Sequence, residues 1–499
     1  MGNMDLLAIA PEITLLLGAV AVLMVAVGSD IGSRAWAWIA GLSLLLAWLF
    51  SVWQWRWVDS EGPQLSFGLD VPQIDRLPMI VTDHFSAFAG VAIFLVAGIA
   101  LAGGWKLVDG LGRRGAEFVA LALLAVAGMH LMTNSANLIL LFMALETASI
   151  ALYVIAGFTR KERNSDEAAM KYFLLGSFAS AIFIYGVALM FAATGSTSLY
   201  GTGGIEAFFG SVVLIEDGVL MAAMALLIVG LGFKVSAAPF HQWAPDVYQG
   251  AAGGAVALMA AGVKIAGFAA LARILVGALN VQFEAWAPAL AMIAALSVIV
   301  GTGFAIAQDD LKRMLAYSGV AHAGFIMTAL VNGEGGVPAM WFYVVTYAVE
   351  LVGVFTIIAV IGGYRTGAFK IESLAGLSER SPSLALAMSV LMLALAGIPL
   401  TAGFASKFVV FAAAIEAGYT WLVVVGLVTA VGGLYFYLRT IAVMYFKSPV
   451  PADVPGAARG RILVGTASGI VIWVAVAATV FLGIDPWALL ELARHALPL

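Results

Sequence analysis

Apolar stretches of about 20 residues recur along almost the whole chain, and this repetition limits the possible folds more than any other feature. A helix needs about 20 apolar residues to cross the hydrocarbon core of a bilayer. We predict fourteen such spans, near residues 6–27, 34–53, 83–104, 116–132, 136–157, 169–194, 218–238, 252–275, 286–307, 311–331, 338–362, 383–414, 419–443 and 461–483. The chain is 63% hydrophobic and 11% charged, whereas soluble domains carry about 25% charged residues. The sequence therefore predicts one all-α integral membrane domain over residues 1–499.

The basic residues are distributed unequally over the predicted loops. If the N-terminus faces outward, the inward side carries 17 Lys and Arg residues and the outward side carries four. The outward residues are Arg56, Arg76, Arg273 and Arg494. Because cytoplasmic loops of membrane proteins are enriched in Lys and Arg, both termini are predicted to face away from the cytoplasm, with an even number of spans.

The composition excludes several classes of function. The chain has no cysteine, which excludes disulfides, thiolate chemistry and cysteine ligation of iron–sulfur clusters. A net charge of −5 gives no indication of a nucleic-acid partner. We find no metal-ligand cluster, no phosphate-binding glycine loop and no nucleophile–base arrangement in the sequence. The chemistry is therefore expected within the membrane spans.

Three lysines, Lys234, Lys264 and Lys407, lie inside predicted spans rather than in loops. A charged side chain at mid-membrane costs roughly 2.5–3.5 kcal/mol even on insertion scales, and such residues mark ion or proton pathways. Lysine suits a proton pathway because burial favours its neutral form and a nearby carboxylate favours its charged form. Glu146, in the middle of the fifth predicted span, supplies a carboxylate. These four residues predict a proton path.

Structural roles for the same residues remain open at this point. Glu146 and Lys234 could form a buried ion pair that only holds helices together. Lys264 could extend its side chain to the membrane interface, although it lies about twelve residues from either end of its span.

Three further titratable residues lie within predicted spans. His322, in the tenth span, could bridge Lys264 to Lys407 as a proton relay or could be a packing histidine. His130 is interpreted as structural. Glu350 is an acid without an evident partner, and its role stays open.

Glycines and prolines interrupt two spans beside these lysines. Pro239 and Pro245 follow Lys234 in GLGFKVSAAPFHQWAPDVYQG, which covers residues 230–250. Gly397, Pro399 and Gly403 precede Lys407 in the twelfth span and predict a second break. Broken transmembrane helices are tolerated where they line a cavity, and two at corresponding places are typical of inverted repeats. The seventh and twelfth spans are five apart, an odd number that inverts the topology. The same glycines could instead serve helix packing alone.

Four motifs resemble a known family. They are LETASIALYVIAG, GFKVSAAPFHQWAPDVYQGA, DDLKRMLAYSGVAHAGF and AGIPLTAGFASKF. The chain is similar over nearly its whole length to the proton-conducting antiporter-type subunits of respiratory complex I. This resemblance implies about fourteen transmembrane helices with broken helices 7 and 12. It also implies two inverted five-helix repeats, placed at about 116–275 and about 286–443.

Within that family the chain is most similar to the N-type subunits. No long lateral helix can follow the last predicted span, which ends near Leu482, and Lys407 stands where M-type subunits usually have glutamate. The resemblance implies that Glu146 and Lys234 form a coupling pair, that Lys264 is the central relay and that Lys407 leads to the outward side.

The resemblance also implies a function. The chain is expected to be a subunit of a bacterial NADH–quinone oxidoreductase that moves protons from cytoplasm to periplasm across the inner membrane. NADH, FMN, iron–sulfur clusters and quinone would be used by partner subunits, and no cofactor would be bound here. The expected neighbours are M-type and K-type membrane subunits and the lipid bilayer. The alternatives are a subunit of a multi-subunit cation/proton antiporter and a purely structural membrane scaffold.

Overall fold

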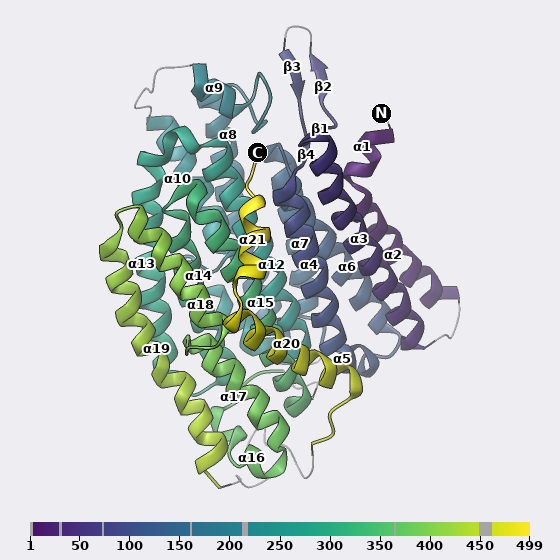
Figure 1. Cartoon of the computed structure of the whole chain (residues 1–499). Coiled ribbons are helices and arrows are strands. Elements are labelled where there is room, and N and C mark those ends of the chain that lie inside the picture. Colours follow the sequence, from purple (N-terminus) through teal and green to yellow (C-terminus); the bar gives the residue numbers. More distant parts are fainter. Residues whose placement is uncertain are drawn as a thin grey trace.

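The computed structural model describes residues 3–28, 32–71, 74–159, 162–211, 218–363, 366–448 and 462–499. They form a helical bundle with short elements at its two ends (Figure 1). Within these ranges, eleven helices are long and apolar enough to cross a membrane, and two apolar helices are shorter. The predicted all-α membrane class is confirmed, and the count of fourteen spans stays a prediction.

The first part of the bundle runs to residue 278. Its helices are α1 (Asn3–Ala8), α2 (Ala10–Gly28), α3 (Ser33–Glu61), α4 (His84–Gly103), α5 (Trp105–Gly110), α6 (Arg114–Asn134), α7 (Leu138–Ala156), α8 (Arg163–Thr194), α9 (Ile205–Ser211), α10 (Gly218–Lys234), α11 (Trp243–Gly250), α12 (Gly253–Ala272) and the π-helix η1 (Arg273–Ala278).

The second part contains the remaining helices. They are η2 (Asn280–Gln282), α13 (Phe283–Ile306), α14 (Leu311–Leu330), η3 (Gly333–Gly336), α15 (Val337–Gly362), η4 (Ile371–Leu374), α16 (Leu377–Arg380), α17 (Pro382–Ala396), α18 (Ala402–Glu416), α19 (Thr420–Phe446), α20 (Thr466–Ile484) and α21 (Trp487–His495).

Two small antiparallel sheets of two strands each occupy the connection between α3 and α4. Strand β1 (Gln64–Ser66) pairs with β4 (Ile80–Thr82), and β2 (Leu69–Val71) pairs with β3 (Ile74–Leu77). They lie at the same end of the bundle as α1 and the C-terminus (Figure 1). The backbone N–H of Leu499 donates to Asp83 Oδ2 at 3.1 Å, which fixes the last residue beside the start of α4. The chain therefore begins and ends on one side of the bundle.

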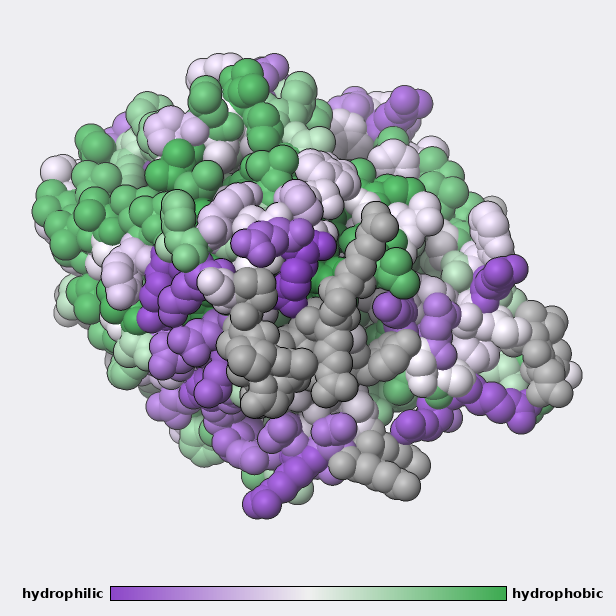
Figure 2. Space-filling model, turned by 90° about the horizontal axis from the view of Figure 1, so that it is seen from below, coloured by the Kyte–Doolittle hydropathy of each residue, from purple (hydrophilic) through white to green (hydrophobic). Residues whose placement is uncertain are grey.

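The opposite end of the bundle is strongly hydrophilic. Figure 2 looks onto this end and shows hydrophilic side chains gathered over its middle and lower parts, whereas hydrophobic side chains cover its upper and left parts. Five residues of the inward basic count lie outside the described residues: Arg160, Lys161, Arg365, Arg459 and Arg461.

Arg273, counted on the outward side at the end of a predicted span, forms contacts that the sequence did not predict. Its side chain is fully buried and forms a two-pronged ion pair with Asp83, with both N–O distances at 2.9 Å. The Arg273 Nε–H also donates to the carbonyl of Thr133 at 2.7 Å. No local pattern in the sequence indicates this ion pair, because Asp83 lies 190 residues away.

Helix α12 is the centre of the bundle. All residues from Gly253 to Ala272 are buried except Gly254, which is partly exposed. A helix that is apolar on every side is expected to be buried on every side. At its start, Gly254 packs so closely on Gly104 at the end of α4 that a Cβ on either glycine would lie 2.9 Å from the Cα of the other. Lys264 is the one charged residue of α12, and it therefore lies at the centre of the molecule.

The first broken helix is formed by α10 and α11. Helix α10 ends at Lys234 and α11 begins at Trp243, with Pro239 in the connection. The break leaves backbone groups without helical partners, and neighbouring side chains satisfy several of them. Trp243 Nε1 donates to the Phe233 carbonyl at 2.9 Å, and Ser297 Oγ on α13 accepts from the Ala238 N–H at 2.9 Å. The interruption predicted from the prolines is confirmed.

The second broken helix is formed by α17 and α18. Gly397 ends α17 with φ +86°, a left-handed conformation that glycine adopts without steric strain. The N–H groups of Gly397 and Ile398 donate back to the last turn of α17, and α18 begins at Ala402. The predicted span 383–414 is therefore two half-helices. Gly403 allows them to meet, because a Cβ there would lie 1.8 Å from the Ala394 carbonyl oxygen.

Candidate functional site

Lys234 is the last residue of α10 and is buried, with 2% of its surface exposed. Its Nζ donates to Ser149 Oγ on α7, and it lies 5.9 Å from the centre of the Tyr153 ring one turn further along α7. A hydroxyl and an aromatic face thus hold the ammonium group, because α10 stops where α7 presents its polar side.

Glu146 lies on the same face of α7 as Ser149, three residues earlier. Its side chain is half-buried and accepts a hydrogen bond from Ser180 Oγ on α8. Among the described residues, no ion pair within 4.0 Å joins Glu146 to Lys234, although the two charges interact electrostatically. The predicted pair is therefore two groups that interact electrostatically, rather than a contact ion pair.

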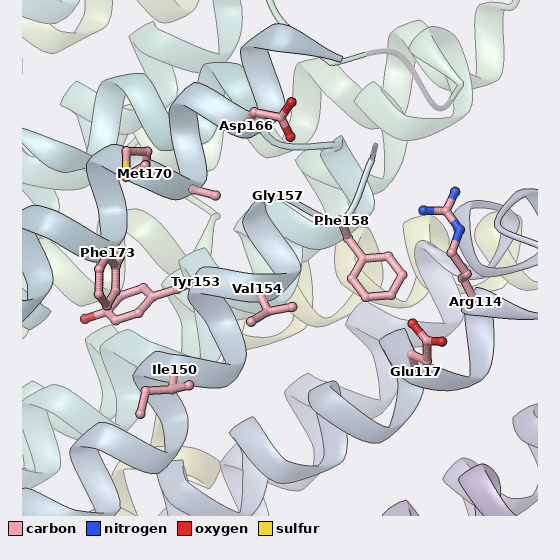
Figure 3. A pocket seen from close by; sticks show the side chains of 11 residues that line it. Arg114, Glu117, Ile150, Tyr153, Val154, Gly157, Phe158, Asp166, Met170 and Phe173 are labelled. Carbon is pink, nitrogen blue, oxygen red and sulfur yellow. The ribbon is translucent and has the colours of Figure 1, made fainter. Parts of the chain in front are cut away.

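A groove on the bundle surface reaches this part of the site (Figure 3). It encloses about 660 Å³ between α6, α7 and α8. Arg114 and Asp166 line it in the first turns of α6 and α8, whereas Ile150 and Tyr153 line it deeper along α7. The groove therefore runs from the hydrophilic end of the bundle toward the aromatic ring that covers Lys234.

Lys264 joins the first broken helix to α14. Its Nζ donates to the Val235 carbonyl at 2.9 Å and to the Gly319 carbonyl at 2.7 Å. Val235 directly follows Lys234, so Lys264 binds the backbone at the point where α10 is interrupted. The last carbonyls of a helix carry partial negative charge, which stabilises a cation. Only 2% of Lys264 is exposed, which excludes the extended, interface-seeking conformation left open above.

His322 on α14 lies in a group of tyrosines. Its Nδ1 is 3.0 Å from the Tyr343 hydroxyl and its Nε2 is 3.1 Å from the Tyr437 hydroxyl. The Tyr347 ring stacks on the imidazole with the two centroids 4.4 Å apart, and the same Tyr347 ring lies 5.8 Å from Lys264 Nζ. A neutral imidazole has one donor and one acceptor nitrogen, and each faces a hydroxyl here.

Lys407 binds the end of the other broken helix. Its Nζ donates to the Leu395 carbonyl at 3.1 Å and to the Ala396 carbonyl at 2.7 Å, and it lies 5.3 Å from the centre of the Phe325 ring. Lys264 and Lys407 thus share one feature, in which an ammonium group binds a backbone carbonyl at a helix break. Lys234 differs, because it ends the first half-helix and binds side chains.

Polar and aromatic groups lie between the predicted residues. The series begins with the electrostatic interaction of Glu146 with Lys234 and continues through the Val235 carbonyl to Lys264. It then runs through Tyr347 to His322, which interacts electrostatically with Lys407. The tyrosines of this series were not predicted. Tyr343 and Tyr347 are four residues apart on α15, and this helical spacing was the available signal.

A second buried polar cluster, away from this series, was also missed. Glu12 Oε1 on α2 accepts from His130 Nδ1 at 2.7 Å and from Asn134 Nδ2 at 2.8 Å on α6. The second oxygen of Glu12, His130 Nε2 and Asn134 Oδ1 have no hydrogen-bond partner among the described residues. Of this cluster, His130 alone was predicted from the sequence, as a structural residue.

Gly397→Ala is expected to displace Lys407. A Cβ at residue 397 would lie 2.8 Å from both Cδ and Nζ of Lys407, which forces the ammonium group away from the two carbonyls. Gly418→Ala is the matched control, because Gly418 also has positive φ (+82°) but a Cβ there meets nothing within 4 Å. Both variants carry the left-handed strain of about 1–2 kcal/mol.

The measurements are the thermal unfolding of each variant and the rate of proton pumping, the activity predicted for Lys407. Equal destabilisation of both variants, with activity lost in Gly397→Ala alone, is the expected result. Equal activity in the two variants would show that the position of Lys407 beside the carbonyls does not matter.

Comparisons with known proteins identify the family. Residues 135–432 match the family described as NADH:quinone oxidoreductase/Mrp antiporter, transmembrane. NADH-quinone oxidoreductase subunit N of Trichlorobacter lovleyi is 36% identical over 447 residues, which are 89% of this chain and 88% of that protein. The subunit N of Mycobacterium bovis is 44% identical over 386 residues, 76% of this chain and 71% of that protein.

A solved structure agrees with these relatives. A chain of respiratory complex I from Thermus thermophilus, solved with bound aureothin, superposes with a TM-score of 0.79 at 33% identity, covering 97% of this chain and 99% of that chain. The family match covers more than half of the chain, and the relatives exceed 30% identity over most of it. The chain belongs to the family of subunit N of NADH-quinone oxidoreductase.

Proposed function

We propose that this chain translocates protons across a bacterial inner membrane as the N-type subunit of NADH–quinone oxidoreductase, driven by quinone reduction in other subunits. The observation that carries the proposal is the series of buried cations beside two helix breaks. Lys234, Lys264 and Lys407 are each at most 8% exposed, and none has a carboxylate within 4.0 Å among the described residues. A scaffold would gain nothing from three such groups, because burying an unpaired charge is unfavourable.

The residues would act in sequence. A charged Glu146 carboxylate stabilises the ammonium form of Lys234 by Coulomb attraction. When that attraction weakens, Lys234 releases a proton from Nζ toward Lys264, whose Nζ binds the adjacent carbonyl of Val235. The proton then passes through the His322–tyrosine group toward Lys407 and the outward side. Each transfer moves one proton between nitrogen or oxygen atoms and needs no redox group in this chain.

The helix order supports the proposed inverted repeats, at about 116–275 and about 286–443. Each range holds five spans, and the fourth span of each is broken: α10 with α11 in the first, α17 with α18 in the second. Within each repeat the break lies next to a buried lysine. The matching positions of the broken span and of the buried lysine support the proposal of two repeats.

The surroundings of the chain follow from the same proposal. Both termini would face the periplasm, and the hydrophilic end in Figure 2 would face the cytoplasm. M-type and K-type subunits would be the membrane neighbours, and partner subunits would hold NADH, FMN, iron–sulfur clusters and quinone. The chain has no cysteine with which to ligate an iron–sulfur cluster.

Glu146→Gln tests the proposed function. Gln keeps the shape and the hydrogen bond with Ser180 but removes the charge that acts on Lys234. We expect the assembled complex in proteoliposomes to pump protons more slowly by about tenfold or more, within the range that acid–base groups contribute. Glu146→Asp should retain part of the activity.

Glu117→Gln is the control, because it removes an exposed carboxylate that lines the same groove. The assay measures NADH-driven proton movement with and without sodium ions. Wild-type pumping by Glu146→Gln would contradict a proton-coupling role, and pumping that requires sodium would favour the cation/proton antiporter alternative.

A further inference from the structure

Glu350 on α15 is a buried carboxyl group that the proposed path does not use. The residue is 2% exposed, and its Oε1 has no hydrogen-bond partner among the described residues. Within the described ranges, neither oxygen takes part in a hydrogen bond or in an ion pair shorter than 4.0 Å. Buried polar groups are almost always hydrogen-bonded, so an unsatisfied carboxyl group at this depth requires an explanation.

The face of α15 that carries Glu350 also contacts the candidate proton path. Tyr343, Thr346, Tyr347 and Glu350 are spaced three or four residues apart and therefore share one side of the helix. Tyr343 bonds His322, and Thr346 Oγ1 lies 2.9 Å from Ser406 Oγ on α18. Ser406 directly precedes Lys407. Glu350 is one turn beyond Thr346, and the Lys407 charge interacts with it electrostatically.

A second unsatisfied group lies on the same turn of α15. The Tyr347 hydroxyl is buried and has no hydrogen-bond partner among the described side chains and backbone groups. It also interacts electrostatically with Glu350. Water is the small molecule that can both donate to a carboxylate and accept from a phenol. The two groups thus provide the polar lining that a water-mediated proton transfer needs.

Among the described residues, Lys407 has no carboxylate within 4.0 Å. Its Nζ binds two carbonyls. The titratable side chains around it are His322, Tyr343, Tyr347 and Tyr437, and none of them is a carboxylate. Glu350 is the carboxyl group that acts on Lys407. This repeats the arrangement at the first break, where Glu146 acts on Lys234 from a neighbouring helix.

We propose that Glu350 is a proton-carrying residue, paired with Lys407 as Glu146 is with Lys234, and that it accepts the proton that Lys407 releases. The transfer breaks an N–H bond of the ammonium group and forms an O–H bond on the carboxylate. It converts one positive and one negative group into a neutral amine and a neutral acid, so the net charge of the buried pair does not change. The inference rests on the proposed proton translocation and extends it by a residue in the outward half of the path.

Glu350→Gln in the assembled complex tests this role. We expect proton pumping to fall by about tenfold or more, as for other acid–base groups, and Glu350→Asp to restore part of it. The dependence of the pumping rate on pH should also change, because a titrating group is removed. Glu416→Gln is the control, since it removes an exposed carboxylate at the end of α18. In a Lys407→Met background, Glu350→Gln should cause no further loss.

The outcomes separate this inference from the function on which it rests. If Glu146→Gln impairs pumping and Glu350→Gln leaves both the rate and its pH profile unchanged, Glu350 carries no proton and the path runs without it. If both variants pump normally, the proposed function itself fails.

A Glu350→Gln variant that fails to assemble into the complex also tests the inference. Removing one partner of a buried pair leaves an uncompensated charge, whereas removing both does not. If Glu350→Gln fails to assemble, the Lys407→Met, Glu350→Gln double variant should assemble again. Continued failure of the double variant would mean that Glu350 serves packing rather than Lys407.

Discussion

Lys264→Met is expected to reduce proton pumping by about tenfold or more, a change that corresponds to a barrier higher by about 1.4 kcal/mol. Lys264 is the one charged residue of α12, and its two hydrogen bonds connect the break after α10 to α14. Methionine keeps the length and packing of the side chain but cannot hold a proton. Without Lys264, no titratable side chain directly joins Lys234 to the His322 group in the contacts described above.

Lys264→Arg separates charge from proton transfer. Arginine keeps its proton under physiological conditions and can still donate to carbonyl groups. We expect this variant to assemble and to pump as poorly as Lys264→Met. If Arg restored pumping, the positive charge alone would matter, and Lys264 would be a fixed electrostatic element rather than a relay.

Assembly has to be measured beside activity. In the methionine variant the carbonyls of Val235 and Gly319 lose the ammonium donor, and a buried carbonyl left unsatisfied costs about 1–3 kcal/mol. Lys370→Met, at an exposed position before η4, controls for the loss of one lysine. Wild-type pumping by an assembled Lys264→Met complex would remove Lys264 from the path.

The membrane spans and both breaks could be predicted from the sequence because their causes are local. A run of 20 apolar residues needs no partner to be recognised, and Pro239 interrupts a helix wherever it lies. The lysines were recognisable for the same reason, since a charge inside such a run is visible in the sequence alone. The motif resemblance added the family, which the comparisons then confirmed.

The contacts of the site could not be predicted, because they join distant parts of the chain. Lys264 binds Gly319 at a separation of 55 residues, and His130 binds Glu12 at a separation of 118. No local pattern states which carbonyls a buried lysine will reach, since that depends on where a neighbouring helix breaks. Arg273 illustrates the same limit, because its position near a predicted span end gave no sign of the ion pair with Asp83.

Lys234→Ala is expected to have the second large effect. Lys234 is the lysine of the series that interacts electrostatically with Glu146. Its loss therefore removes the proposed step in which the Glu146 carboxylate controls the protonation of a lysine. Two unit charges about 8 Å apart interact by roughly 2 kcal/mol at an effective dielectric constant of 20. That energy changes a protonation equilibrium by roughly thirtyfold, which is enough to switch a lysine between its two forms.

We expect the Lys234→Ala complex to assemble, because Ser149 Oγ still donates to the Leu145 carbonyl within α7 and is not left unsatisfied. Proton pumping and coupled NADH oxidation should both fall by about tenfold or more. Lys234→Arg should lose pumping in the same way, since a guanidinium group interacts with the charge of Glu146 but does not release its proton. Lys106→Ala, at an exposed position on α5, is the control.

The decisive comparison is with Glu146→Gln. If Lys234 and Glu146 form one switch, the double variant should pump no worse than Lys234→Ala alone, because each single change already disables the shared step. Additive losses in the double variant would mean that the two residues act independently, and the coupling of the carboxylate to the lysine would have to be abandoned.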